Sequence, residues 1–415
     1  MTYLTLGEVA EYINGRAFKP NEWEDIGLPI IRIQNLTNST QIINRTSKVF
    51  EDKYLVKDGD LLFAWSASLG AHIWHGEDGW LNQHIFRVIP YANIDKMYLY
   101  YFLLHVIDEL YAKTHGSGMV HITLKPFKST PIPVPELDIQ RKIAETIRNL
   151  FAKLDEASEK AQEVVDGFET RKAAILHKAF SGELTAKWRE ENNVSFDEWN
   201  NKLFDECIEK MQNGLAKRNG STGVPYVVLR LANLSDDGFI TDDLRKIVLD
   251  EKEQKSYKLN VGDVVMIRVN GSKDNVAKQI LVAENNLWAF CDHIIRIKYN
   301  ESVLPEYMVL YSKSETYKIY VKDNIVSSAG QNTISRKGMA RLSIPVPSID
   351  EQKEIANILS DMFEKERRVK ETAEAVIEQM DIMKKAILAR AFRGELGTND
   401  PSEESAVELL KKIIK

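Results

Sequence analysis

Two loops in the second half of this 415-residue sequence carry side chains that suit hydrogen bonding to nucleic acid. The first loop is Arg268-Val269-Asn270-Gly271-Ser272-Lys273, and the second runs from Ser327 to Thr333 and precedes two basic residues. Arginine matches the two acceptors of guanine, asparagine or glutamine matches adenine, and basic side chains suit phosphates. The residues that we expect to contact nucleic acid here are Arg268, Asn270, Lys273, Gln331, Asn332, Arg336 and Lys337.

The first half of the chain offers different chemistry at the equivalent places. Its first loop is Trp65-Ser66-Ala67-Ser68-Leu69-Gly70, which has a large aromatic ring and hydroxyl groups but no charge. Its second loop runs from Gly116 to His121 and is followed by two lysines. Two readers of different sequences would differ in this way, although ordinary loop variation would produce the same contrast. The candidate contact residues in this half are Trp65, Ser66, Ser68, His121, Lys125 and Lys128.

A weaker pair of candidates precedes these loops in each half. Arg32 and Asn35 in the first half match Arg230 and Asn233 in the second. All four side chains can bond to bases or phosphates. The asparagines can equally serve to form turns, which leaves two interpretations open.

The sequence shows no motif for common catalytic or metal chemistry. It has no GxxxxGK[ST] phosphate loop, no zinc-ligand spacing, and no recognisable nuclease or S-adenosylmethionine methyltransferase motif. His84 and His293 recur beside apolar runs, and we interpret them as core histidines rather than ligands or bases. We therefore expect a binding protein without a metal or cofactor of its own. An enzyme with an unrecognised site is one alternative.

The net charge of −6 argues against unspecific attraction to nucleic acid. Residues 1–134 hold 12 Lys and Arg against 14 Asp and Glu, whereas residues 203–345 hold 20 against 18. Binding must therefore come from clustered loops, and we expect modest affinity from this chain alone. Only two cysteines are present, and the longest apolar stretch, 97–107, is too short to span a bilayer. We expect a cytoplasmic protein.

The chain contains two copies of one plan. Ile132-Pro133-Val134-Pro135 recurs as Ile344-Pro345-Val346-Pro347, and Ala179-Phe180 recurs as Ala391-Phe392, with the same offset of 212 residues. Upstream of these blocks the repeats are weaker and their offsets drift. Gly59-Asp60, for example, matches Gly262-Asp263. The two copies are thus expected to share a β-rich scaffold with variable loops, followed by a segment of fixed length.

Each Pro-rich block precedes a segment with the heptad seam of a long helix. The first seam consists of Ile143, Ile147, Leu150, Leu154, Ala157, Ala161, Val164 and Phe168, and the second includes Ile355, Leu359, Met362, Val369, Ala373, Val376, Met380, Met383, Ile387 and Ala391. We expect Asp138 and Asp350 to cap the helices, and Gly182 and Gly394 to end them. The 43 residues from Asp138 to Phe180 would make a helix roughly 65 Å long.

We expect these two helices to pair as an antiparallel coiled coil, because a single isolated helix would leave its seam exposed. The alternative is that each helix packs on its own domain. Arg171 and Glu366 interrupt the two seams. We hypothesise that they meet across the antiparallel helices and help to set the register.

These patterns predict an α+β fold with a pseudo-twofold internal repeat, in which two mixed α/β domains are joined by two long antiparallel coiled-coil helices. We divide the chain into a first domain (1–134), a first long helix (135–182), a linker (183–202), a second domain (203–345), a second long helix (346–394) and a tail (395–415). Within these parts we expect shorter helices at 97–112, 203–211, 305–321 and 406–414.

This layout resembles the specificity subunit of Type I restriction-modification systems over nearly the whole chain. The residues that carry the resemblance are the two Ile-Pro-Val-Pro blocks, Gln140 with Ile143-Ala144, Glu351-Gln352, and the blocks 179–184 and 391–396. Gly59-Asp60-Leu61-Leu62 and Gly262-Asp263-Val264-Val265 are similar to the family's recurring strand. Ile139 stands where the second copy has Glu351, which is a mild departure.

The resemblance implies that the two domains are target recognition domains, each reading one half of a bipartite site in double-stranded DNA. It implies that the paired helices set the gap between the halves and dock two modification subunits, which bind S-adenosylmethionine, and that restriction subunits join this core. The chain itself would not be catalytic. The alternative from another class is a coiled-coil protein scaffold without DNA readout.

Overall fold

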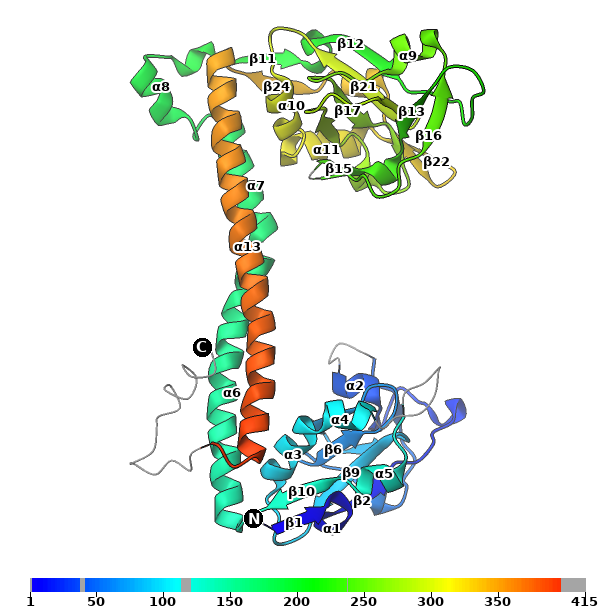
Figure 1. Ribbon diagram of the computed structural model, residues 1–415, viewed down its shortest axis with the longest axis vertical. Helices are drawn as coiled ribbons and strands as arrows, with labels where there is room; N and C mark the ends of the chain where they lie inside the picture. The colour runs from blue at the N-terminus through cyan, green and yellow to red at the C-terminus, as the bar shows by residue number, and fades with distance from the viewer. Residues whose placement is uncertain (1, 38–41, 113–120, 237, 397–415) are drawn as a thin grey trace. The chain divides into compact units, whose positions relative to one another are not determined.

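The computed structural model describes the chain except for residues 1, 38–41, 113–120, 237 and 397–415. The chain divides into two compact units. The first unit comprises residues 1–162 and 373–415, and the second comprises residues 163–372. Each unit contains one globular domain and a segment of each long helical region (Figure 1).

The domain of the first unit is built on two small sheets. One is antiparallel in the order β2-β9-β6-β7, and the other has the order β4-β3-β8-β5 with β3 and β8 parallel. The strands are β2 (Ala10–Asn14), β3 (Leu28–Ile31), β4 (Arg45–Thr46), β5 (Leu55–Val56), β6 (Leu61–Ala64), β7 (Gly70–Ile73), β8 (Gly79–Leu81) and β9 (Ile85–Pro90). The helices are α1 (Leu6–Val9), α2 (Ile33–Thr37), α3 (Lys96–His105), α4 (Ile107–Ala112) and α5 (Leu124–Lys128).

The domain of the second unit repeats this topology, as the weak sequence repeats predict. Its antiparallel sheet has the order β12-β21-β17-β19, and its second sheet, β16-β13-β20, again contains a parallel pair, β13 with β20. The sheet strands are β12 (Ile208–Asn213), β13 (Val224–Leu229), β16 (Lys246–Leu249), β17 (Val264–Ile267), β19 (Gln279–Leu281), β20 (Trp288–Phe290) and β21 (Ile294–Tyr299). Short ladders are formed by β14 (Leu234–Ser235), β15 (Gly238–Phe239), β18 (Val269–Asn270), β22 (Val326–Ser328) and β23 (Gln331–Thr333). The helices are α9 (Glu251–Tyr257), α10 (Pro305–Tyr311), α11 (Glu315–Asn324) and α12 (Arg336–Met339).

The repeated Gly-Asp pair begins the central strand of each antiparallel sheet. Gly59 and Gly262 have φ angles of +82° and +88°, a conformation that glycine adopts without strain. The aspartate that follows accepts a hydrogen bond from the backbone three residues earlier, at 2.9 Å in both copies. Asp60 also pairs with Arg87, at 3.0 Å. The motif is therefore a turn that starts β6 and β17.

The two Ile-Pro-Val blocks form edge strands. β10 (Pro131–Val134) pairs antiparallel with β1 (Thr2–Thr5), and β24 (Ser343–Val346) pairs with β11 (Asn200–Leu203). An edge strand tolerates proline because one side of its backbone makes no ladder hydrogen bond. A tyrosine from each domain helix then fixes the strand, because Tyr98 Oη donates to Pro133 O at 2.7 Å and Tyr307 Oη to Pro345 O at 2.6 Å.

A buried glutamine clips each long helix to its own domain. Gln140 donates through Nε2 to Asn93 O (3.1 Å) and Pro135 O (2.9 Å), and its Oε1 accepts from Asp95 N (2.9 Å). Gln352 makes the same three bonds in the second unit, to Ser302 O, Pro347 O and Leu304 N. The start of each helix is thereby held against the loop that precedes α3 or α10.

The first long helical region is not the single helix that the seam predicts. It consists of α6 (Leu137–Asp166) and α7 (Phe168–Phe180), separated at Gly167, whereas α13 (Ile349–Phe392) is continuous. Both regions begin one residue before the predicted aspartate caps, and Ser348 Oγ accepts from Glu351 N at the start of α13. Gly182 and Gly394 follow the ends of α7 and α13 with φ of +83° and +76°, which confirms them as terminators.

Within each unit the two helical segments pair, as expected from the seams. In the first unit Ile147 and Leu150 of α6 share a core with Ile387 of α13. In the second unit Leu176 of α7 shares a core with Ile355 of α13. The domain sheets and helices belong to these same cores. The seam prediction is wrong at Val369, whose side chain is exposed.

Other sequence predictions differ from the structure. The helix expected at 203–211 is wrong, because these residues form the end of β11, a 3-10 turn (Phe204–Cys207) and the beginning of β12. The linker contains α8 (Ala186–Asn192), and the helices expected at 97–112 and 305–321 are each split into two. The tail helix predicted at 406–414 lies outside the described residues. No helix among the described residues is long and apolar enough to cross a membrane.

Candidate nucleic-acid interface

The two loops predicted from the first half of the sequence lie side by side. Ile122 N donates to Trp65 O at 3.1 Å, and Ser66 and His121 form an isolated β-bridge. Trp65 itself packs on Phe86, and its Nε1 donates to Asn14 Oδ1 at 2.9 Å. Residues 113–120, which complete the second loop, lie outside the described residues.

The second unit repeats this junction with other side chains. Ile334 N donates to Arg268 O at 3.0 Å, and β18 pairs with β23 so that Asn270 faces Asn332. β22 and β23 form a hairpin whose turn residues, Ala329 and Gly330, both have positive φ. Sequence-distant loops are thus joined through backbone hydrogen bonds in both domains. The side chains at this junction remain free to differ.

The exposed side chains of the second junction are mostly polar. Gln331 and Lys273 are exposed, as is Lys337 on the following helix. Arg336 is also exposed and pairs with Asp205, at 2.8 Å. In the first unit Ser68 and Lys125 are exposed, whereas Lys128 is half-buried and lies 5.9 Å from the ring centre of Tyr12.

A pocket of about 290 Å³ adjoins the second junction. Its basic lining comes from Lys217, Arg218, Arg230, Arg245 and His293. Arg268 reaches the rim of the pocket, where NH1 donates to Asp292 O at 3.4 Å. Among the residues that the structure describes, Arg230 Nε is buried and has no hydrogen-bond partner. Phosphate oxygens are the acceptors that suit such a cluster.

At the corresponding part of the first domain, arginine side chains lie against aromatic rings. The guanidinium of Arg16 lies 4.5 Å from the ring centre of Phe18 and 4.0 Å from that of Phe50. Arg32, the counterpart of Arg230, lies over Trp23 at 5.3 Å. These rings and arginines can stack on bases, whereas the second pocket offers mainly charge.

Comparison with known proteins shows the family to which the chain belongs. Residues 1–165 and 217–379 match the family model of the Type I restriction modification DNA specificity domain. The chain belongs to this family. The specificity subunit of the StySPI enzyme from Salmonella potsdam is 30% identical over 433 residues, covering 98% of this chain and 93% of that protein. The EcoKI specificity subunit of Escherichia coli K12 is 26% identical, with coverage of 98% and 93%.

Solved structures agree in fold. The HsdS subunit from Thermoanaerobacter tengcongensis has a TM-score of 0.58 at 17% identity, covering 95% of this chain and 97% of that one. A chain from a study of complex assembly and conformational transition in a type I R-M system has a TM-score of 0.68 at 17% identity, with coverage of 95% and 98%. Sequence recognition of DNA is the role of this family. This role favours DNA contact over the alternative of a protein scaffold.

In this specificity subunit, several predicted readers are used inside the domain instead. Asn233 is buried, its Oδ1 accepts from Arg230 N at 3.0 Å, and its Nδ2 donates to Asp243 O at 3.0 Å. Asn35 makes the equivalent bond to Arg32 N at 3.1 Å. The geometry therefore favours the turn-forming interpretation of both asparagines.

Three further predicted contact residues of the specificity subunit are also buried or bonded within their own loops. Asn332 is buried, donates to Gly271 O at 2.8 Å and accepts from Ser327 Oγ at 2.7 Å. Asn270 Oδ1 accepts from Ser272 N, and Ser66 is buried. These side chains shape the loops, and their exposed neighbours present the surface.

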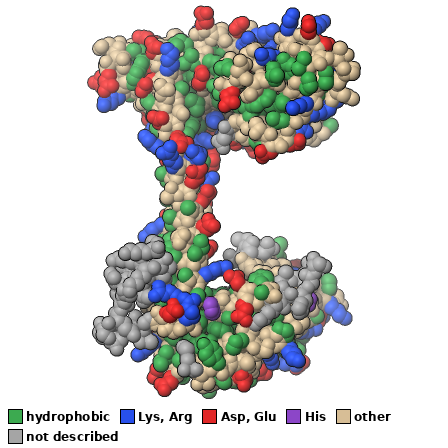
Figure 2. All heavy atoms as spheres, viewed as in Figure 1, with side chains coloured by type: hydrophobic (Ala, Val, Ile, Leu, Met, Phe, Trp, Pro, Cys, Tyr) green, Lys and Arg blue, Asp and Glu red, His purple; other side chains and the backbone are tan. Residues whose placement is uncertain are grey.

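Sequence reasoning missed Lys217, Arg218 and Arg245, which line the pocket of the specificity subunit. The signal was the run Lys217-Arg218-Asn219-Gly220, a basic pair beside a glycine turn. His293 was interpreted as a core histidine, yet its side chain is 36% exposed and lines the pocket. On the face of the second domain that Figure 2 shows, basic side chains are dispersed among side chains of other types.

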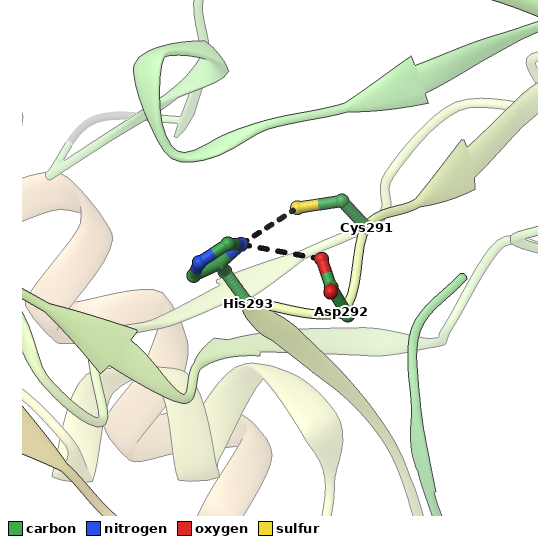
Figure 3. A group of neighbouring side chains, drawn as sticks. All are labelled: Cys291, Asp292 and His293. Carbon is green, nitrogen blue, oxygen red and sulfur yellow. Dashed lines mark hydrogen bonds and ion pairs between the residues drawn. The ribbon is translucent and has the colours of Figure 1, made fainter. Parts of the chain in front are cut away.

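Cys291, Asp292 and His293 lie together at the edge of this pocket (Figure 3). His293 Nδ1 is 3.2 Å from Asp292 Oδ1 and 4.0 Å from Cys291 Sγ. Arg218 already bonds both carboxylate oxygens of Asp292, at 3.0 and 3.1 Å. Burial also raises the pKa of the Cys291 thiol, which opposes the thiolate that binds metals. We therefore interpret the group as an ion-paired wall of a basic pocket.

Proposed function

We propose that each domain of this specificity subunit reads one half of a bipartite site in double-stranded DNA through its joined loops, to which the second domain adds the adjacent basic pocket. The observation that supports this most strongly is the repeated junction, Ile122 N to Trp65 O and Ile334 N to Arg268 O. It builds one surface from two loops in each domain while leaving the side chains free to vary. Such a surface suits two readers with one fold and different targets.

The two surfaces predict different kinds of contact. In the second domain, Arg268 and Gln331 have the donors and acceptors for base edges, while Arg218, Arg230 and Arg245 suit backbone phosphates. In the first domain, Trp65 and Trp23 offer flat rings, and Ser68 and Lys125 offer hydrogen bonds and charge. We infer that the halves of the DNA site are unlike.

The paired helices are proposed to set the spacing of the two half-sites and to dock two modification subunits, with restriction subunits joining the complex. S-adenosylmethionine is expected on the modification subunits, and this chain is proposed to act in the cytoplasm without catalysis of its own. A specificity role in the family implies this division of labour. Modest affinity of the isolated chain follows from its charge of −6.

The test uses the subunit in complex with its modification subunits and a library of duplexes. Selection should yield an interrupted sequence. Arg268→Ala should weaken binding by about 10- to 100-fold and relax discrimination in one half only, and Trp65→Ala should affect the other half. Lys252→Ala, an exposed lysine on α9, is the matched control. Selection of no bipartite sequence by the complex would refute the proposal.

A further inference from the structure

The second unit contains a larger cavity that the DNA interface does not account for. Its volume is about 390 Å³, and it lies between α7 and one side of the globular domain. α7 contributes Lys172 and Leu176, the loop before β19 contributes Lys273 and Val276, and α11 contributes residues including Tyr317. The size is within the range of small-molecule sites, which is about 300–1,000 Å³.

The floor of this cavity is buried and largely apolar, and its polar groups are hydrogen-bonded to one another. Leu176, Val276 and Tyr317 are all buried. Tyr317 Oη accepts from Gln279 Nε2 at 2.9 Å and donates to Ala277 O at 2.8 Å, and Gln279 Oε1 accepts from Tyr299 Oη at 2.7 Å. These bonds satisfy the buried polar groups within the domain. The floor can therefore receive a flat or apolar group without leaving a donor unpaired.

The walls of the cavity carry an excess of lysine. Its six lysines are Lys172, Lys273, Lys278, Lys313, Lys318 and Lys322. Four carboxylates share the lining, and ion pairs join Lys278 to Asp236 at 2.6 Å and Lys322 to Asp274 at 3.0 Å. Among the described residues, Lys172 and Lys318 form no such ion pair, and Lys172 Nζ lies 5.6 Å from the ring centre of Phe363.

The lowered pKa of Asp236 indicates that the lysines make the cavity electrically positive. Burial raises its pKa, but the hydrogen bond from Lys278 and the nearby charges of Lys172 and Lys313 outweigh this effect, so its pKa lies below the ordinary value. A carboxylate here is thus stabilised by three lysines from different elements. A ligand anion in the same space would experience the same field.

We propose that this cavity binds a small polyphosphate anion of the nucleotide class, with its phosphates among the lysines and its base on the apolar floor. A phosphate chain matches flexible ammonium groups that converge from several elements. A DNA duplex, whose major groove alone is about 12 Å wide, does not fit a space of this volume. The site is therefore separate from the proposed DNA interface, although Lys273 borders both.

The experiment is calorimetric titration of the full-length subunit with tripolyphosphate, with ATP in the absence of divalent metal, and with adenosine. ATP and tripolyphosphate should bind with one site per chain, and adenosine should bind more weakly than either. Lys172→Gln combined with Lys318→Gln should weaken ATP binding at least tenfold. Lys318→Glu, a single change on the exposed side of α11, should also weaken it. Lys187→Gln on α8 is the matched control and should bind as the unchanged protein does.

DNA binding by the complex with modification subunits is measured in parallel, and the double variant should retain it. Thermal unfolding confirms that each variant is folded. The proposal is overturned if ATP does not saturate one site, if adenosine binds as tightly as ATP, or if the lysine variants bind ATP as tightly as the Lys187→Gln control. If the unchanged subunit binds ATP but its complex with modification subunits selects no bipartite sequence, the proposed function alone is refuted.

Discussion

Arg171 on α7 and Glu366 on α13 form an ion pair, with Nε and Oε2 separated by 2.7 Å. The two residues were expected to meet because both interrupt apolar seams, and this contact is confirmed, whereas their role in setting the register stays a prediction. Arg171 NH2 also donates to Val164 O at 3.0 Å, across the break at Gly167. A Cβ at Gly167 would lie 2.6 Å from Arg171 NH1. The absence of a side chain at Gly167 therefore leaves room for the Arg171 guanidinium, which spans the helix break and pairs with Glu366.

A double-mutant cycle should detect this pair. Because both side chains are partly exposed, solvent screening limits the coupling between them to about 0.5–1 kcal/mol. The cycle compares Arg171→Gln, Glu366→Gln and the double variant by urea unfolding. The exposed pair Arg141 with Asp138 serves as the control and should show less coupling. Equal coupling energies in the two cycles would show that the Arg171–Glu366 pair stabilises the fold no more than an exposed pair does.

The ion pair between Arg189 and Glu351 is buried, so removal of one partner should cost more stability than removal of an exposed one. Glu351 at the start of α13 is fully buried, and its carboxylate accepts from Arg189 NH1, from Thr185 Oγ1 at 2.6 Å and from Trp199 Nε1 at 2.9 Å. Arg189→Ala leaves this carboxylate without its counter-charge. The variant should lower the free energy of unfolding of the second unit by about 3–5 kcal/mol, measured by urea denaturation.

The sequence repeat suggests a second substitution that should reverse the effect of Arg189→Ala. Ile139 occupies the first-copy position of Glu351, and Pro401 occupies the second-copy position of Arg189, so neither charge recurs. Adding Glu351→Ile to Arg189→Ala should therefore restore a large part of the lost stability. If the double variant is no more stable than Arg189→Ala, then a stranded carboxylate is not the cause of the loss.

The first unit should lose stability in mild acid. His105 ends α3 and stacks on Phe392 of α13, with ring centres 5.3 Å apart. Burial, helped by the charge of Arg393, lowers the pKa of His105 below its ordinary value. The unfolded chain therefore binds the proton more readily, so stability present above about pH 6.5 is lost as the pH falls below it.

The measurement is the thermal midpoint between about pH 7.5 and about pH 5.5. His105→Phe preserves the stacking and removes the titration, so it should flatten the pH dependence. Burial also lowers the pKa of His72 in the same domain, so a smaller slope should remain. An unchanged slope in His105→Phe would assign the effect to other groups.

Much of this architecture could be predicted from the sequence because it depends on repeated, local patterns. The offset of 212 residues marked two helical regions, and their seams predicted the pairing. The two loops in each domain were selected because glycine and polar residues cluster there. The structure joins them through backbone hydrogen bonds, and their contact with DNA stays a prediction. The contact between the two loops could not be predicted from the sequence. Trp65 and Ile122 are separated by 57 positions, and Arg268 and Ile334 by 66, so each pair meets only through the folded sheets.

What the sequence did not reveal depends on contacts that have no local signature. The break at Gly167 arises because Arg171 folds back over the glycine, while the seam itself continues through it. Asn233 has the same residue type as a base-reading asparagine, and only its burial assigns it to the turn. Arg245 lies near Arg230 because β16 pairs antiparallel with β13, and Arg218 bonds Asp292 just after β20, which pairs parallel with β13. No spacing rule anticipates this cluster.

The glutamine clips offer a further test of how the helices are held. Gln352 is fully buried, and its amide makes three hydrogen bonds to the backbone. Gln352→Ala strands those backbone groups and should cost about 1–3 kcal/mol in urea unfolding. Lys353→Ala, one residue along the helix and exposed, should change stability by less than about 0.5 kcal/mol. Similar losses in both variants would argue that the clip contributes little.

Two neighbouring amide side chains in the β22–β23 hairpin, Gln331 and Asn332, should have different effects on DNA base preference and on stability. Asn332 is buried and bonded to Gly271 and Ser327, whereas Gln331 is exposed. Asn332→Ala should therefore lower the free energy of unfolding by about 1–3 kcal/mol, because it leaves buried polar groups unpaired. Gln331→Ala should leave stability within about 0.5 kcal/mol but change base preference in one half-site of the complex. Urea denaturation and duplex selection measure the two effects. If Gln331→Ala altered stability but not base preference, the exposed edge of the hairpin would not be a reading surface.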